Sequence, residues 1–104
     1  MHNTPYVYAI TDGTHIKIGV AQRPSKRLRA LSTGNAVKLT LLGYFHGGYE
    51  VEKQLHQTFT KVRQNGEWMV ASPELISYLN SQLIDKFIVI SSNTIHAYDK
   101  MRTI

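Results

Sequence analysis

The sequence predicts an α+β protein in which about three helices flank a small, mostly antiparallel three-stranded sheet. Two patterns carry this prediction. Hydrophobic side chains alternate with other residues on both sides of Asp12-Gly13, as in a β-hairpin, whereas apolar residues between positions 49 and 63 recur at helical spacing. The chain has 104 residues, of which 42% are hydrophobic. That is enough for one buried core and too little for two full-sized domains.

The first predicted element is a hairpin formed by residues 6–10 and 15–20. A turn centred on Asp12-Gly13 gives three cross-strand pairs, Tyr8 with Lys17, Tyr6 with Gly19 and Val7 with Ile18. Successive side chains point to opposite faces of a strand, so one face is aliphatic and consists of Val7, Ala9, Ile16 and Ile18. The opposite face carries Tyr6, Tyr8, His15 and Lys17 around Gly19, which has no side chain.

A helix is predicted from Pro24, which suits a first helical position, to about Gly34, which suits a C-terminal stop. One side of its helical wheel is basic, with three cations within about 100° of one another, namely Arg23, Lys26 and Arg27. The neighbouring sector is apolar and contains Leu28 and Leu31. This helix is therefore expected to bury one side and to present a positively charged one.

The third strand is predicted at residues 37–46, and Gly47-Gly48 ends it. A second helix is predicted from Tyr49 to Arg63. Its apolar stripe follows the helical period and consists of Val51, Leu55, Phe59 and Val62. One edge of that stripe carries Glu52, His56 and Arg63.

The last part of the chain contains weaker signals. Asn65-Gly66 predicts a turn, and Trp68 to Val70 is a short apolar piece. Ser72 is expected to cap a last helix whose buried face consists of Leu75, Ile76, Leu79 and Leu83. Phe87 to Ile90 can add a further strand, whereas no period is recognisable beyond Ser91. We expect a domain over residues 1–84 and an extension over 85–104 that packs on it or is partly ordered.

Composition excludes several classes of function. The chain has no cysteine, which excludes disulfides, iron–sulfur clusters and cysteine nucleophiles. Neither a signal peptide nor a stretch of about 20 apolar residues is present, so a soluble, cytoplasmic protein with no membrane partner is expected. The formal net charge of +5 favours polyanionic partners such as nucleic acid.

Five motifs occur in an order that resembles the GIY-YIG nuclease superfamily. Tyr6-Val7-Tyr8 stands where that superfamily has GIY, and Lys17-Ile18-Gly19 stands where it has YIG. Arg27 follows Gly19 by eight residues, a spacing similar to that of the superfamily's catalytic arginine. Residues 52–56 (ExxLH) and 66–68 (GEW) resemble a branch of small phage and bacterial proteins. The sequence departs from the pattern at Tyr6, which replaces a glycine, and at Lys17, which replaces a tyrosine.

The resemblance implies a metal-dependent endonuclease that hydrolyses DNA phosphodiester bonds. Its catalytic residues would be Tyr8 as the base, Lys17 as its helper, Arg27 on the phosphate, Glu52 as the ligand of Mg²⁺ or Mn²⁺, and His56. Magnesium commonly binds through one or two carboxylates, and a guanidinium fork suits phosphate oxygens. A lysine directly opposite Tyr8 would favour its phenolate. For His56, a hydrogen bond to Glu52 or to the backbone is expected more than direct metal binding.

Basic residues are expected to hold the backbone of nucleic acid, with double-stranded DNA the first choice. They are Arg23, Lys26, Arg29, Lys61 and Arg63. Because such contacts read little sequence, specificity is expected from a homodimer, a partner protein or the shape of the nucleic acid. Two alternatives are a binding module that keeps the nuclease scaffold without turnover and a small phage-type interaction or inhibitor protein. Turnover is favoured because binding alone requires no acidic residue near phosphate.

Overall fold

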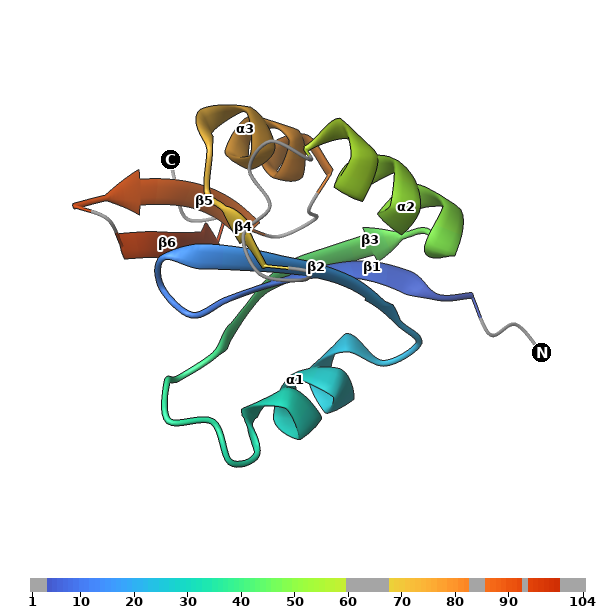
Figure 1. Cartoon of the computed structure of the whole chain (residues 1–104), viewed down its shortest axis with the longest axis horizontal. Coiled ribbons are helices and arrows are strands. Elements are labelled where there is room, and N and C mark those ends of the chain that lie inside the picture. Colours follow the sequence, from blue (N-terminus) through green and yellow to red (C-terminus); the bar gives the residue numbers. More distant parts are fainter. Residues whose placement is uncertain (1–3, 60–67, 83–85, 93, 100–104) are drawn as a thin grey trace.

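The computed structural model describes residues 4–59, 68–82, 86–92 and 94–99 (Figure 1). The elements in chain order are β1 (Tyr6–Thr11), β2 (His15–Ala21), α1 (Pro24–Ser32), β3 (Thr40–His46), α2 (Tyr49–Thr58), β4 (Trp68–Val70), α3 (Pro73–Gln82), β5 (Lys86–Ser91) and β6 (Thr94–Asp99). The predicted α+β class is confirmed, and every strand pair in the described residues is antiparallel.

The main sheet has four strands in the order β3-β1-β2-β4, not the predicted three. The fourth is the short apolar piece Trp68–Val70, which pairs with His15, Ile16 and Lys17 of β2. Three residues are too few to show a strand period in the sequence, and tertiary pairing alone makes this segment a strand. Because β4 is so short, it covers only the first half of β2.

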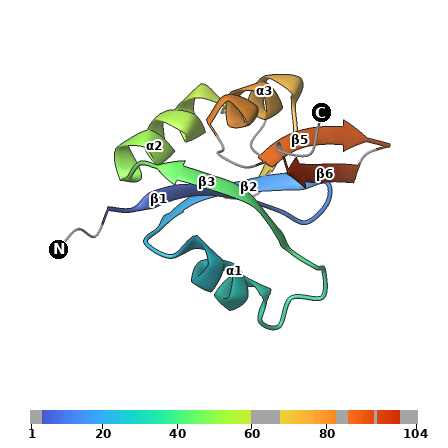
Figure 2. The same ribbon diagram turned by 180° about the vertical axis from the view of Figure 1, so that it is seen from behind.

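The helices form layers on both faces of the main sheet (Figures 1 and 2). On one face α1 lies alone, above a small cluster of Tyr8, Ile10 and Leu39 that Leu28 and Leu31 complete. On the other face α2 and α3 cover the larger core, which includes the predicted aliphatic residues Val7, Ala9, Ile16 and Ile18. The sheet thus separates two hydrophobic clusters, and both of its faces are buried by helices.

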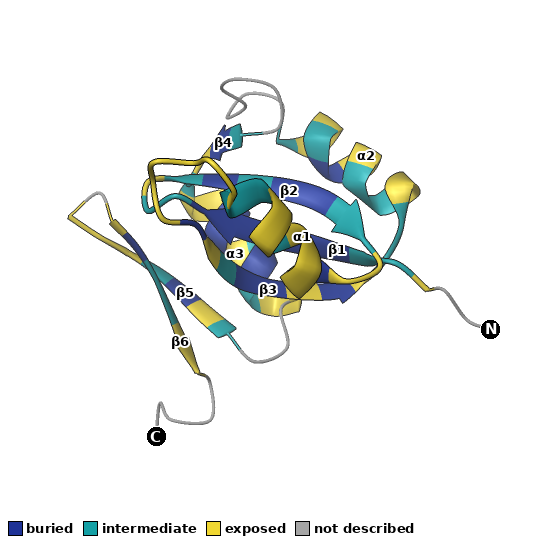
Figure 3. Ribbon diagram, turned by 90° about the horizontal axis from the view of Figure 1, so that it is seen from below, coloured by how far each residue is buried: buried dark blue, intermediate teal, exposed yellow. Residues whose placement is uncertain are grey.

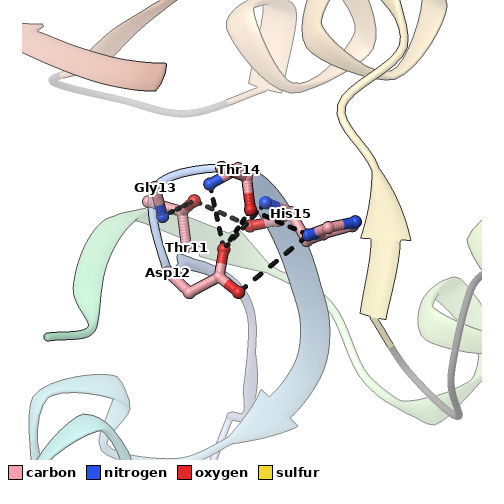
Figure 4. A network of polar contacts seen from close by, with 5 residues as sticks. All are labelled: Thr11, Asp12, Gly13, Thr14 and His15. Carbon is pink, nitrogen blue, oxygen red and sulfur yellow. Dashed lines mark hydrogen bonds and ion pairs between the residues drawn. The ribbon is translucent and has the colours of Figure 1, made fainter. Parts of the chain in front are cut away.

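The predicted register of the β1–β2 hairpin is wrong by two residues. Tyr8 lies opposite Gly19, and Lys17 lies opposite Ile10. The reason is the turn, which is centred on Gly13-Thr14 (Figure 4). Asp12 Oδ1 accepts hydrogen bonds from the backbone N–H groups of Thr14 and His15, at 2.9 and 2.8 Å. A shift of two residues keeps each side chain on its predicted face.

The turn is closed further by Thr11, whose hydroxyl donates to the carbonyl of His15 at 2.7 Å. The backbone N–H of Gly13 donates to the same hydroxyl oxygen at 2.9 Å. Gly13 has a φ of +106°, a conformation that glycine adopts without the strain other residues would carry. The hydrogen bonds of the Thr11 and Asp12 side chains within the turn therefore set the register of the hairpin.

The remaining predicted helices and the third strand are present, but two of these elements are shorter than predicted. The third strand begins at Thr40 rather than at residue 37, and α2 ends at Thr58 with Phe59 as its C-cap, before the predicted end at Arg63. Helix α1 begins at Pro24 as predicted and ends at Ser32, two residues before Gly34 with its φ of +75°. Ser72 Oγ accepts a hydrogen bond from the N–H of Leu75 at 3.2 Å, which confirms the predicted cap of α3. Several predicted features lie outside the described residues, namely Lys61, Val62, Arg63, Asn65-Gly66, Glu67 and Leu83.

The C-terminal residues form a second, two-stranded sheet from β5 and β6. The structure confirms the strand at Phe87–Ile90 and adds Thr94–Asp99, for which no period was recognised. The side-chain amide of Asn80 on α3 holds β5 through two hydrogen bonds with the backbone of Ile88, at 3.0 and 2.6 Å. The N–H of Ile95 donates to the carbonyl of Gly13 at 2.8 Å. Within the described residues, no helix is both long and apolar enough to cross a membrane.

Candidate functional site

The side chain of Tyr8 lies across the backbone of Gly19. A Cβ atom placed on Gly19 would overlap the phenol end of that ring, with Cε2 of Tyr8 at 2.9 Å. The two residues are cross-strand partners, so their side-chain positions share one face of the sheet, the face that α1 covers. Gly19 is therefore required at this position to make room for Tyr8.

The side chain of Tyr8 is almost completely buried, with 2% of the residue exposed. Its ring belongs to the cluster beneath α1, together with Ile10 and Leu39. Packing against Gly19 and this cluster therefore holds the phenol in a fixed position.

Lys17 lies on the same face as Tyr8 but is not its direct partner. It is two residues from Gly19 along β2, which makes it a diagonal neighbour of Tyr8. Diagonal positions lie roughly 7–8 Å apart and remain within reach of a long side chain. Its Nζ also lies 5.8 Å from the ring centroid of Trp68, the residue opposite Lys17 on β4. The prediction that Lys17 lies directly opposite Tyr8 is thus wrong, and the two residues occupy diagonal positions.

Glu52 and His56 come from α2, one helical turn apart, and both are half-buried. The ring of His56 donates through Nε2 to the carbonyl oxygen of Ile18 at 3.3 Å. That carbonyl belongs to the part of β2 beyond Lys17, where β4 no longer pairs with it. Of the two hydrogen bonds expected for His56, the structure contains the one to the backbone. Helix α2 therefore reaches β2 at the peptide that precedes Gly19.

Three predicted cations line an open groove beside α1, with a volume of about 550 Å³. Its lining includes Arg23, Lys26 and Arg27, all exposed. Much of the outer surface of α1 is exposed (Figure 3). No acidic residue occupies the first turn of α1, so neither a carboxylate nor the helix dipole offsets this positive charge. Arg29 is exposed in the last turn and does not line the groove among the described residues. The predicted basic side of this helix is present at its N-terminal end.

The structure therefore brings the predicted residues together in two groups. Tyr8, Lys17 and the cations of α1 lie on one side of the sheet. Glu52 and His56 lie on the helix that covers the other side, and His56 contacts β2 at the carbonyl of Ile18. Lys61 and Arg63 lie outside the described residues. Tyr8 and His56 meet β2 from opposite sides at Ile18 and Gly19.

Sequence reasoning missed two residues beside Tyr8. Tyr44 on β3 lies directly opposite Tyr8, and His46 lies opposite Tyr6. Both belong to the predicted third strand, for which the sequence indicated no role in a site. The available signal was their spacing of two, which places them on one face of β3.

Comparisons with known proteins give one match. The family model of the T5orf172 domain matches residues 5–86, which include every described element from β1 to α3. Among curated proteins and among solved structures, no match is found.

Proposed function

We propose a function from the premise that the chain belongs to the T5orf172 domain family, a phage-associated family related to nuclease-like folds. On this premise the protein is a GIY-YIG-type endonuclease that hydrolyses phosphodiester bonds of DNA. The observation that carries the proposal is the position of Tyr8 across the backbone of Gly19, which holds the phenol end in one place beside β2. Stabilising the fold alone would not require a glycine in the centre of a strand.

The proposed chemistry is the attack of water on phosphorus. Tyr8, as phenolate, accepts a proton from the water while the new oxygen–phosphorus bond forms and the bond to the leaving oxygen breaks. Lys17 offers its positive charge to that phenolate from the diagonal position. Arg27 donates hydrogen bonds to the non-bridging phosphate oxygens, which carry additional negative charge in the transition state.

The metal proposed for this reaction is Mg²⁺ or Mn²⁺, held by Glu52. The donor set fits an ion that keeps most of its waters, since Glu52 is a half-buried carboxylate and the described residues contain no group of three potential ligands. When bound, such an ion would polarise the phosphate and neutralise the leaving oxygen. His56 is proposed to fix the edge of β2 through the carbonyl of Ile18 and so to position Gly19 and Tyr8.

The decisive experiment is nicking of supercoiled plasmid with Mg²⁺, with Mn²⁺ and with chelator. The parent protein should nick only when metal is present. Glu52→Gln should lose about 100-fold or more of the rate, as when one transition-state contact is removed, yet bind DNA at least as tightly. Glu50→Gln is the matched control, because Glu50 is an exposed carboxylate of the same helix turn. Equal nicking by Glu52→Gln and the parent would exclude Glu52 from the site.

A second candidate is a DNA-binding module without turnover. The cationic groove beside α1 supports it, because Arg23, Lys26 and Arg27 can grip phosphates whether or not the bond is cut. The same plasmid experiment separates the two. Tight, salt-sensitive binding with no nicking in either metal would favour the binding module and overturn the hydrolytic proposal.

A further inference from the structure

Three aromatic rings lie together on the face of the sheet that carries Tyr8. Tyr6 packs edge-to-face against Tyr44 with ring centroids 5.0 Å apart, and its ring lies 4.6 Å from that of His46. The cluster spans β1 and β3, since Tyr6 is opposite His46 and Tyr8 is opposite Tyr44. We refer to Tyr6, Tyr44 and His46 as the aromatic platform.

The platform is left uncovered by α1. The cluster of residues beneath that helix contains Tyr8, Ile10 and Leu39 but none of the three platform residues. Tyr44 is 38% exposed, His46 is exposed and Tyr6 is half-buried. An aromatic cluster that served only the core would lie under the helix, as Tyr8 does. Tyr44 and His46 are instead accessible to solvent.

The charge around the platform indicates what can lie on it. The chain carries a formal net charge of +5, and three of its cations line the groove beside α1 on this side of the sheet. An exposed aromatic surface on the same side of a sheet as a cationic groove is an arrangement with which proteins bind single-stranded nucleic acid, whose phosphates follow the charge while its bases stack on the rings. An apolar protein partner would gain nothing from the cations.

We propose that the aromatic platform binds an unpaired base of a DNA strand by stacking on Tyr44. This inference rests on the proposed function and narrows its substrate class. Tyr44 and Tyr8 are cross-strand partners, so their Cβ atoms lie about 5 Å apart. A base on Tyr44 would therefore lie on the same face of the sheet as Tyr8, whose phenol end lies across Gly19 on the neighbouring strand β2. The preferred substrate is DNA with an unpaired segment rather than a continuous duplex.

The test measures binding in chelator, so that no cleavage contributes. The probe is a short single strand with 2-aminopurine as its central base, and a strand with an abasic site at that position is the comparison. The parent protein should change the fluorescence of 2-aminopurine and bind the abasic strand more weakly. Tyr44→Ala should weaken binding of the intact strand by roughly 5- to 150-fold, the range for loss of one base stack. Tyr44→Phe, which keeps the ring, should restore it.

Tyr98→Ala is the matched control, because Tyr98 is 48% exposed on β6 and lies outside both the platform and the groove. It should bind like the parent. Equal affinity of the parent for intact and abasic strands, or parent-like binding by Tyr44→Ala, would overturn the stacking proposal. A parent that stacks the base but never nicks plasmid would instead contradict only the proposed hydrolysis.

Discussion

At the scale of single residues, Gly19 determines where Tyr8 lies. Gly19→Ala places a methyl group in the space that the phenol end of Tyr8 occupies, so the ring of Tyr8 must move away from this position. We expect about 100-fold slower nicking, because the base is displaced from the phosphate, with a modest decrease in the free energy of unfolding. Gly48→Ala is the control, since its new Cβ would lie 3.5 Å from Pro5 in ordinary contact. Parent-like nicking by Gly19→Ala would contradict the role of Tyr8.

Asp12 provides a prediction about pH. Burial alone would raise the pKa of its carboxyl, but hydrogen bonds from the backbone of Thr14 and His15 outweigh burial and hold the pKa below its usual value of 3.8. A carboxyl with a lowered folded-state pKa stabilises the fold above the unfolded pKa and loses that contribution as pH falls through the folded value.

Asp12→Ala should therefore lower the free energy of unfolding at pH 7 by about 1–3 kcal/mol, the cost of hydrogen bonds to a charged group. Denaturant titrations at several pH values should show that this difference shrinks below about pH 4. Asp12→Asn keeps an acceptor oxygen for Thr14 and His15, so it should lose less stability at pH 7. A difference that stays constant from pH 7 to pH 2 would contradict the assignment.

At the scale of elements, the positive charge in the first turn of α1 lowers the stability of this helix. Its first turn contains Lys26 and Arg27 and no acidic residue, although the helix dipole favours acids there. Lys26→Glu should raise the free energy of unfolding by about 0.3–1 kcal/mol and at the same time weaken binding of DNA. Thermal unfolding and a DNA-binding titration on the same sample test both signs.

Lys53→Glu is the control for Lys26→Glu, because it changes the net charge equally at an exposed position of α2 that does not line the groove. If both variants lose the same DNA affinity, overall charge rather than the groove binds DNA. If Lys26→Glu is less stable than the parent, the dipole argument fails.

At the scale of the whole molecule, the net charge of +5 predicts salt-dependent binding. Contact of Arg23, Lys26 and Arg27 with one phosphate each would give a slope of log K against log salt concentration of about −3 on duplex DNA. Arg27→Ala should reduce the magnitude of that slope by about 1. Measurements of DNA affinity from 50 mM to 200 mM salt test this. If the affinity did not change with salt concentration, DNA would be excluded as the partner.

The alternation of residues 6–20 was sufficient to predict a hairpin and to assign Val7 and Ile18 to the core, because a period of two is a local property. The register was not predictable in the same way. It depends on which residues the side chain of Asp12 caps, and a turn centred on Gly13-Thr14 moves Lys17 away from direct contact with Tyr8.

Long-range pairing explains the other differences. Strand β4 is a strand only because β2 lies beside it. Strand β6 pairs with β5 through its backbone, and its half-exposed residues His96 and Ala97 gave no clear alternation in the sequence. For the candidate site, the motifs predicted which residues to consider. The contact of His56 with Ile18 joins residues 38 positions apart, which no local pattern encodes.

The brevity of β4 has a consequence for handling the protein. An uncovered strand edge is a template onto which another polypeptide can add. Among the described residues, β4 pairs with β2 only at His15, Ile16 and Lys17, and α2 reaches the following part of β2 through the hydrogen bond of His56 to Ile18. Variants that loosen α2, such as His56→Ala, should therefore self-associate as their concentration rises. Loss of nicking and onset of aggregation would then have one origin, so light scattering belongs beside every kinetic measurement on this helix.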